Sequence, residues 1–290
     1  MDEAYQYADD FPDERIAQQR DVMHKTAQPA GDRFQSDAER YASYLTTPEG
    51  RLRLDLAFAN LEEFLCARSP SSLCALDLGG GTGATAVRLA RLGVRVTLLD
   101  SSQAMLDIAR HAALEAGVAA QVAMQLGDAA HVADLFPGRS FDVVLCHNLL
   151  EYVDEPHLVL VEAARAMRDS ASILSVLVRN RAGEVLKAAI QAGDLKAAEN
   201  AVTEEWGHES LYGGKVRLFT LDTLRALLKA ASLTVVAERG VRVASDYLPP
   251  QVSRSAQYEQ IIKLESKLGR RPEFTAVARY LHCLARRTPE

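Results

Sequence analysis

The chain has 290 residues, of which 48% are hydrophobic and 25% are charged, and its formal net charge is −6. This composition is typical of an ordinary globular protein and excludes a disordered chain. The longest apolar run, 173–178, is far shorter than the roughly 20 residues that cross a bilayer, so we expect no membrane-spanning helix. The length allows one elaborated domain or a domain with appendages.

The first 21 residues carry seven acidic residues and two arginines, so most of the negative charge of the chain belongs to this segment. Such a start is unlike the positively charged beginning of a signal peptide, and it predicts a cytoplasmic protein. We assign 1–45 to an acidic N-terminal tail and extension, and 46–290 to one folded domain. The sequence gives the tail no role and leaves the oligomeric state open.

Residues 50–67 place Leu54, Phe58 and Leu61 on one stripe, which predicts an amphipathic helix packed across the edge of a sheet. From residue 73 onward, short apolar runs alternate with helical segments, as is typical of a parallel sheet with crossover helices. The predicted strands are 73–78, 95–99, 121–126, 141–146 and 171–178. The predicted helices between them are 84–92, a helix capped by Ser102, and 156–167.

Residues 180–215 interrupt this alternation with five glycines around an Ala-rich helical pattern, and they predict an inserted cover over the functional site. The elements expected after the cover are a helix at 221–231, a strand at 234–243, a helix at 257–268 and a strand at 275–285. The direction of this last strand is open, because an antiparallel return is compatible with the pattern. The expected fold is a doubly wound, seven-stranded, mostly parallel α/β sheet with an N-terminal helical extension.

The four cysteines are far apart and form no CxxC pair, and the histidines are never three to five residues apart. Neither pattern indicates a disulfide framework or a metal site. Cys146 and Cys283 lie in apolar, strand-like runs, so we expect them to be buried thiols.

The segment Asp77 to Gly83 lies between a predicted strand and a predicted helix and contains four glycines. Glycine lets the backbone turn sharply and approach a ligand that would collide with any Cβ, so this loop predicts a nucleotide site. Gly79, Gly81 and Ala84 also satisfy the dinucleotide pattern GxGxxG/A, which keeps a nicotinamide cofactor open.

Two acidic residues follow the next two predicted strands. Asp100 comes 19 residues after Gly81, where a carboxylate is suited to accept hydrogen bonds from both hydroxyls of a ribose. Ser101, beside it, is assigned to the same site. Asp128 follows the third strand, and it is interpreted either as a ligand contact or as a helix N-cap.

The acid two residues before the first glycine, together with Gly127 to Ala129 and the run 141–144, resembles the class I S-adenosylmethionine-dependent methyltransferases. The resemblance implies a Rossmann-like methyltransferase fold over 46–290, with S-adenosyl-L-methionine as cofactor. In that family the glycine loop, with Asp77 and Gly81, accommodates the methionine part, the acid at Asp100 holds the ribose, and the acid at Asp128 faces the adenine.

A narrower resemblance extends from about Arg33 to Arg287 and points to the bacterial methyltransferases of tRNA 5-carboxymethoxyuridine. The segments that carry it are Thr46 to Arg53, Leu76 to Gly83, His147 to Glu151, Gly240 to Val243, Asp246 with Tyr247, and Ala278 to His282. It implies cofactor contacts from Arg53, Gly79, Gly80, Asp100, Asp128, Ala129 and His147. A guanidinium at Arg53 suits the methionine carboxylate, because its planar fork binds such a group in bidentate fashion.

Candidate substrate contacts come from the cover and from the C-terminal third of the chain. They are Trp206, Tyr212, Arg242, Tyr247 and His282. His147 and Arg242 are the candidates for a catalytic role. The alternative for His147 is a satisfied core histidine, and the alternative for Arg242 is a surface ion pair. A carboxylate acceptor needs no general base, whereas a phenol, hydroxyl or amine would benefit from His147, His282 or Glu151.

The sequence therefore predicts a methyltransferase that modifies oxygen, with a carboxylate as the favoured acceptor. The acceptor is open between a modified tRNA nucleoside and a small acid or metabolite methylated on oxygen or nitrogen. The basic stretch 252–287 favours a polyanion, whereas the acidic segment 204–209 opposes phosphate contact. A nicotinamide-dependent oxidoreductase and a non-catalytic cofactor-binding protein are the rival hypotheses.

Overall fold

The computed structural model describes residues 34, 37–65, 69–138, 140–209, 213–249, 251–252 and 254–288. The acidic tail, Cys66 and the predicted substrate contact Tyr212 lie outside the described residues. No helix in the described part of the chain combines the length and the apolar character that a membrane span requires.

A seven-stranded sheet forms the centre of the molecule, in the order β3-β2-β1-β4-β5-β9-β8. Its strands are β1 (Cys74–Leu78), β2 (Arg95–Asp100), β3 (Val122–Leu126), β4 (Val143–His147), β5 (Ile173–Arg179), β8 (Leu233–Val241) and β9 (Tyr280–Arg287). The first five are parallel, whereas β9 runs antiparallel to both β5 and β8. The predicted sheet is confirmed. The direction of the last strand, which the sequence left open, is antiparallel.

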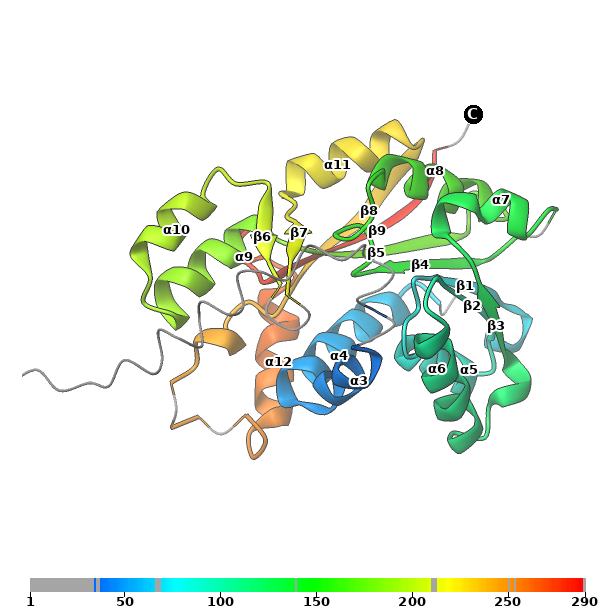
Figure 1. Cartoon of the computed structure of the whole chain (residues 1–290), viewed down its shortest axis with the longest axis horizontal. Coiled ribbons are helices and arrows are strands. Elements are labelled where there is room, and N and C mark those ends of the chain that lie inside the picture. The colour runs from blue at the N-terminus through cyan, green and yellow to red at the C-terminus, as the bar shows by residue number, and fades with distance from the viewer. Residues whose placement is uncertain are drawn as a thin grey trace, which may run out of the picture.

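Helices cover both faces of this sheet (Figure 1). One face packs against α4 (Pro48–Glu62), α5 (Ala84–Arg91) and α6 (Gln103–Glu115), and the other against α7 (Val132–Leu135), α8 (Pro156–Ala166) and α11 (Leu221–Ala230). A third apolar cluster joins α4 to α12 (Tyr258–Leu268). Burial on both faces explains why β1, β4 and β5 are nearly continuous apolar runs.

Local capping fixes several helix starts. Ser102 accepts a hydrogen bond from the backbone N–H of Met105 at 3.3 Å, as the predicted N-cap of α6. The helix expected at 50–67 instead starts at Pro48, because Thr47 caps it through the N–H of Gly50 at 3.1 Å, and it ends at Glu62. The last strand starts at Tyr280 rather than at residue 275, because Pro272–Thr275 forms the short helix α13. Cys146 and Cys283 are buried free thiols, as expected.

The cover contains α9 (Arg181–Leu186), a π-helical turn (Lys187–Gln191), α10 (Leu195–Ala201) and an antiparallel ribbon of β6 (Trp206–His208) and β7 (Lys215–Arg217). Asn180 anchors its start by donating to the carbonyls of Ala276 and Ala278 at 3.0 and 2.8 Å. Figure 1 shows this unit beyond the carboxyl end of β5, at one end of the sheet. The N-terminal helical extension is α3 (Ala38–Thr46), which packs against α4.

Candidate active site

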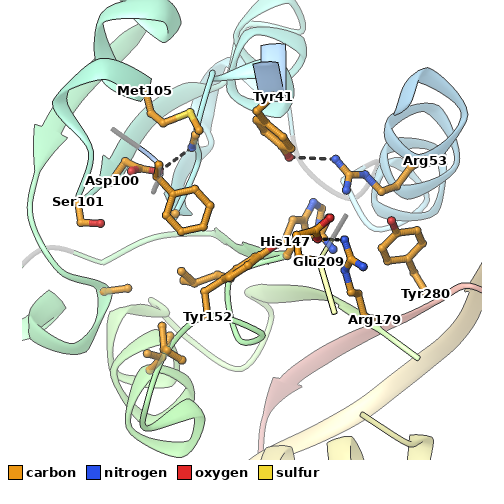
Figure 2. Close-up of a pocket in the computed structure, with 18 of the residues that line it drawn as sticks. Tyr41, Arg53, Asp100, Ser101, Met105, His147, Tyr152, Arg179, Glu209 and Tyr280 are labelled. Atoms are coloured by element: carbon orange, nitrogen blue, oxygen red, sulfur yellow. Dashed lines mark hydrogen bonds and ion pairs between the residues drawn. The ribbon is translucent and has the colours of Figure 1, made fainter. Parts of the chain in front are cut away.

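A cavity of about 800 Å3 opens at the carboxyl edge of the parallel strands, between α3, α4 and the cover (Figure 2). Ligands of doubly wound sheets bind at this edge, because the loops after neighbouring strands converge there. We name the two parts of the wall by their residues. The glycine-loop half contains Gly79, Gly81, Asp100, Ser101, Met105, Asp128 and Ala129, and the arginine half contains Arg179, Lys187, Glu209, Arg242, Asp246, Arg279 and Tyr280.

The loop after β1 requires its glycines. Gly79 and Gly81 have φ values of +61° and +55°, which side chains rarely adopt. A Cβ on Gly80 would lie 2.6 Å from the Cγ of Leu98 and 3.0 Å from the carboxyl group of Asp77. The φ angles of Gly79 and Gly81 and the packing behind Gly80 therefore exclude side chains from this loop. Gly79 and Gly81 line the cavity with backbone that a ligand can approach closely.

Asp77 lies beneath this loop and is only 3% exposed. Its Oδ2 atom is buried without a hydrogen-bond partner among the described residues. Burial, with a smaller contribution from Asp100, raises the pKa of Asp77 to about 7. Asp77 borders a small pocket beside the main cavity, shared with Arg53, Gly80 and His147. A cationic group placed in this pocket would satisfy the orphaned oxygen.

Asp100 joins the loops that follow β1 and β2. Its Oδ2 accepts from the N–H of Gly81 at 2.8 Å, and its Oδ1 accepts from the N–H of Ser102 at 2.9 Å. Burial raises the pKa of Asp100, and the backbone hydrogen bonds partly oppose this rise. A carboxylate oxygen can accept more than one hydrogen bond, so both oxygens keep capacity for a ligand.

Asp128 follows β3 and lines the same half. Its Oδ1 accepts from the N–H of Ala130 at 2.8 Å and so caps the short helix that begins at Ala129. The two interpretations of Asp128 are therefore compatible, since the capping residue also faces the cavity. Its contact with a ligand stays a prediction.

Arg53 extends from α4 between the two halves. Its Nη2 donates to the hydroxyl of Tyr41 at 2.9 Å, and its guanidinium lies 5.2 Å from the ring centre of Tyr44 and 5.6 Å from that of Tyr280. Tyr41 is a lining residue that the sequence analysis did not identify. Aromatic rings hold the buried cation while its remaining N–H groups stay available to an anionic ligand.

His147 ends β4 and borders both the cavity and the small pocket. Its Nε2 is 2.8 Å from the Oγ of Ser175. Burial, together with the charge of Arg53, lowers the pKa of His147 to about 3. A neutral ring with a pKa this low is a weak proton acceptor, which disfavours His147 as a general base. Its contact with the cofactor or the substrate stays a prediction.

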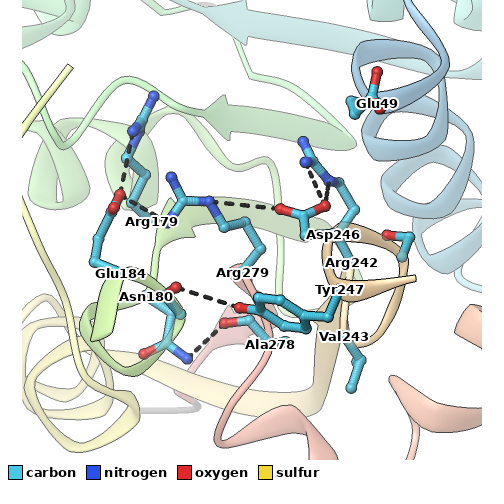
Figure 3. A network of polar contacts seen from close by, with 12 residues as sticks. Glu49, Arg179, Asn180, Glu184, Arg242, Val243, Asp246, Tyr247, Ala278 and Arg279 are labelled. Atoms are coloured by element: carbon cyan, nitrogen blue, oxygen red, sulfur yellow. Dashed lines mark hydrogen bonds and ion pairs between the residues drawn. The ribbon is translucent and has the colours of Figure 1, made fainter. Parts of the chain in front are cut away.

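Buried ion pairs build the arginine half (Figure 3). Arg242 donates to the Oδ1 of Asp246 from Nε at 2.8 Å, and Arg179 pairs with Glu209. The Oε1 of Glu184 bridges Arg179 at 3.3 Å and Arg279 at 2.8 Å. Arg242 forms an ion pair as one alternative predicted, but the pair is buried and not on the surface. Arg242 also lines the cavity, and its contact with a substrate stays a prediction.

The pKa of Tyr280 responds to the electrostatic potential of the arginine half. Burial alone would raise the pKa of its phenol, yet the surrounding guanidiniums of Arg53, Arg179, Arg242 and Arg279 lower it to about 8. Two of these guanidiniums, those of Arg242 and Arg279, lie 5.8 and 6.0 Å from the ring centre. The ion pairs thus leave a positive potential at this end of the cavity, where an anion is stabilised.

Three predicted substrate contacts do not line the cavity as expected. Trp206 is 43% exposed, and its ring stacks 4.6 Å from the guanidinium of Arg217 on the outer ribbon. His282 is fully buried below the cavity, next to Ser175. Tyr247 lies behind the arginine half, where its hydroxyl is 3.5 Å from the carbonyl of Gly183. Glu151 is also buried, where it accepts from the N–H of Arg179 at 2.9 Å.

The sequence analysis missed Arg179, Arg279 and Tyr280. Arg179 is the last residue of β5, and the end of a parallel strand is itself a signal for a site residue. Arg279 and Tyr280 lie at the start of β9, and they reach the same edge only because β9 is antiparallel.

Comparisons of sequence place this chain among methyltransferases. A family described as "Methyltransferase domain" matches residues 76–175. The tRNA 5-carboxymethoxyuridine methyltransferase of Escherichia coli K12 is 28% identical over 262 residues, covering 88% of this chain and 95% of the relative. A ubiquinone biosynthesis O-methyltransferase of Xanthomonas oryzae pv. oryzae is 31% identical over 180 residues, covering 57% of this chain and 70% of the relative.

Solved structures share the fold. The magnesium protoporphyrin IX methyltransferase of Synechocystis PCC 6803 with bound S-adenosylmethionine has a TM-score of 0.58 at 13% identity, covering 91% of this chain and all of that chain. The 1,6-didemethyltoxoflavin-N1-methyltransferase of Burkholderia thailandensis has a TM-score of 0.56 at 18% identity, covering 98% of this chain and 94% of that one. Together with the motif set, these matches show that the chain belongs to the S-adenosylmethionine-dependent methyltransferases, with S-adenosylmethionine as its cofactor.

Proposed function

We propose that this enzyme transfers the methyl group of S-adenosylmethionine to a carboxylate oxygen, and that the acceptor is 5-carboxymethoxyuridine in tRNA. The observation that carries the first part is the gathering of the guanidiniums of Arg53, Arg242 and Arg279 at 5.6, 5.8 and 6.0 Å from the ring centre of buried Tyr280. Their positive potential also lowers the pKa of Tyr280. A carboxylate placed there would be held in its ionised, nucleophilic form.

The residues of the glycine-loop half, together with Arg53 and Asp77 at the small pocket beside it, fit the cofactor. In the proposed seat, Arg53 holds the methionine carboxylate and the orphaned Oδ2 of Asp77 accepts from the methionine ammonium. The remaining acceptor capacity of Asp100 serves the ribose hydroxyls, and Asp128 with Ala129 borders the adenine. The glycine loop suits this close approach, because Gly79 and Gly81 line the cavity without side chains.

The cofactor supplies a methyl group that its sulfonium has already activated. In the transfer, a bond forms between the acceptor oxygen and the methyl carbon, the carbon–sulfur bond breaks, and its electron pair stays on sulfur. No proton moves when the acceptor is a carboxylate, which agrees with a neutral His147 and a buried Glu151. The protein therefore contributes mainly by holding the acceptor close and in line.

Two observations support tRNA as the carrier of this carboxylate. The match to the tRNA 5-carboxymethoxyuridine methyltransferase covers 88% of the chain. Exposed cations also follow one another on α12 and just after it, at Lys263, Lys267, Arg270 and Arg271. One of them, Arg270, pairs with Glu63, but this pair is exposed and can exchange for a phosphate.

The cover favours a second candidate, a small organic acid. Glu204 and Glu205 are exposed just before β6, where an RNA acceptor would bring its phosphates if it passed over the cover. Like charges there would weaken tRNA binding and would not affect a small acid that enters the cavity alone.

Methyl transfer to bulk tRNA that contains carboxymethoxyuridine tests the proposal. We expect transfer at low salt and a steep loss of tRNA affinity as the salt concentration rises. Arg270→Gln with Arg271→Gln should weaken tRNA binding and leave binding of S-adenosylhomocysteine unchanged. Arg91→Gln with Lys229→Gln removes the same charge from exposed positions on α5 and α11 and serves as the matched control. If protein that binds the cofactor product transfers no methyl group to this tRNA, the acceptor is the small acid.

A further inference from the structure

A chain of buried hydrogen bonds runs from α4 to the cavity across β9, β5 and β4. The Nδ2 of Asn60 is 3.3 Å from the Nδ1 of His282, and the Nε2 of His282 is 2.7 Å from the Oγ of Ser175. The same Oγ is 2.8 Å from the Nε2 of His147, which ends the chain at the cavity wall. The two imidazole rings lie edge to face, with 5.3 Å between their centres.

The hydrogen bonds of this series all run in one direction, because the Nδ2 of Asn60 can only donate. The amide nitrogen of Asn60 donates to the Nδ1 of His282, so that nitrogen carries no proton. His282 then carries its proton on Nε2 and donates it to the Oγ of Ser175. The hydroxyl hydrogen of Ser175 remains for the Nε2 of His147, which places the proton of His147 on Nδ1. Burial lowers the pKa of both histidines, so each ring holds one proton, as this assignment requires.

We propose that Asn60, His282 and Ser175 are positioning residues that fix His147 as its Nδ1–H tautomer, so that it donates a hydrogen bond to the methionine carboxylate of the cofactor beside Arg53. His147 and Arg53 border the same small pocket next to the glycine loop. No hydrogen bond to the Nδ1 of His147 is formed by the described residues, and the ring remains partly accessible from the cavity. The inference rests on the seat proposed for this carboxylate, and it does not depend on the identity of the acceptor.

The direction of the chain has a functional consequence. If position 60 offered an oxygen instead of an N–H, each hydrogen bond would reverse, and His147 would present a lone pair to the carboxylate. Two acceptors facing each other repel, so cofactor binding would weaken through this one atom. Asn60→Asp replaces the donor by an acceptor with almost no change in shape, whereas Ser175→Ala interrupts the hydrogen-bond chain in the middle.

The tautomers can be observed directly in the wild-type enzyme by long-range ¹H–¹⁵N correlation spectra of ¹⁵N-histidine-labelled protein, with His147→Gln used for assignment. We expect Nδ1–H for His147 and Nε2–H for His282. The opposite tautomer at His147 in the wild-type enzyme overturns the proposal, whatever the variants do.

Calorimetric titration with two ligands tests the consequence. S-adenosylhomocysteine carries the methionine carboxylate, whereas 5′-methylthioadenosine lacks it. Asn60→Asp and Ser175→Ala should each weaken S-adenosylhomocysteine by about tenfold, the scale of one hydrogen bond to a charged group, and leave 5′-methylthioadenosine nearly unchanged. A purely structural role would affect both ligands equally.

Ser172→Ala is the matched control. Ser172 is also buried, precedes the same strand at its opposite end, and bonds to Asp169 outside the cavity. It should change neither affinity. If Asn60→Asp does not fold, Ser175→Ala and the wild-type spectra carry the test. The positioning role is rejected if Ser175→Ala keeps the wild-type ratio of the affinities for S-adenosylhomocysteine and 5′-methylthioadenosine. This result does not depend on whether the enzyme transfers a methyl group to tRNA.

Discussion

The glycine-loop half of the cavity comes from residues 79–129, whereas the arginine half collects residues from 179 to 280. The first half relies on backbone turns and on carboxylates that bond to nearby N–H groups, such as Asp100 with Gly81 and Ser102. The second half consists of buried ion pairs between distant elements, such as Arg179 with Glu209. A shared cofactor can be held by local loop geometry, but the acceptor site depends on charges that only the assembled fold brings together.

The largest expected effect lies in the arginine half. Arg179→Met leaves the carboxylate of Glu209, which is 2% exposed, without its main cationic partner. An uncompensated buried charge costs about 3–5 kcal/mol of the free energy of unfolding, measured by urea denaturation. Adding Glu209→Gln should recover much of this loss. A loss of less than about 1 kcal/mol in the single variant would show that water already screens this pair.

The next effect lies in the glycine-loop half and concerns ligand affinity. Asp100→Ala should weaken S-adenosylhomocysteine by about 1.5–3 kcal/mol in calorimetric titration, because it removes charged acceptors next to the proposed ribose position. Asp100→Asn keeps the shape and one acceptor, so it should lose less. Asp107→Ala, the same change at an exposed position on α6 outside the cavity, should leave this affinity unaltered. Unchanged binding of S-adenosylhomocysteine by Asp100→Ala would show that the ribose does not lie next to Asp100.

Arg53 lies between the two halves of the cavity. A substitution there distinguishes a contact with the cofactor from a contact with the acceptor. Arg53→Lys keeps the charge but loses the planar fork, so S-adenosylhomocysteine should bind about 1–2 kcal/mol more weakly. Binding of 5′-methylthioadenosine should change little, since it has no carboxylate for the fork. Equal dissociation constants of S-adenosylhomocysteine for the two proteins would assign Arg53 to the acceptor instead.

The smallest expected effect is a pH dependence from Asp77. Its pKa is raised to about 7 in the free enzyme, so below pH 7 the carboxyl group is largely protonated. The methionine ammonium favours the ionised form, so binding releases a proton, and affinity should rise severalfold from pH 6 to pH 7 before levelling off. Titrations in two buffers with different ionisation enthalpies measure the proton released. Asp77→Asn should abolish this release, and its persistence in that variant would identify another group.

The sequence predicted most of the fold because both faces of the sheet are covered and its strands read as apolar runs. The errors lie at boundaries that capping decides, such as Thr47 before α4, and at Thr275, which ends the short helix begun by Pro272 where the last strand was expected to begin. His282 was expected at the substrate. It shares a face of β9 with Tyr280, but it lies two residues, about 7 Å, deeper in the sheet, so it contacts Ser175 instead.

The sequence by itself determined the glycine-loop half, because Asp77, the glycines and Asp100 are consecutive features of one strand–loop–helix–strand unit whose geometry is local. The tertiary structure alone decided the arginine half. The antiparallel direction of β9 brings Arg279 and Tyr280 to the edge where β5 ends with Arg179, and the cover adds Glu209. Charges this far apart in the chain leave no periodic signal, and their effect on Tyr280 exists only once burial removes the water between them.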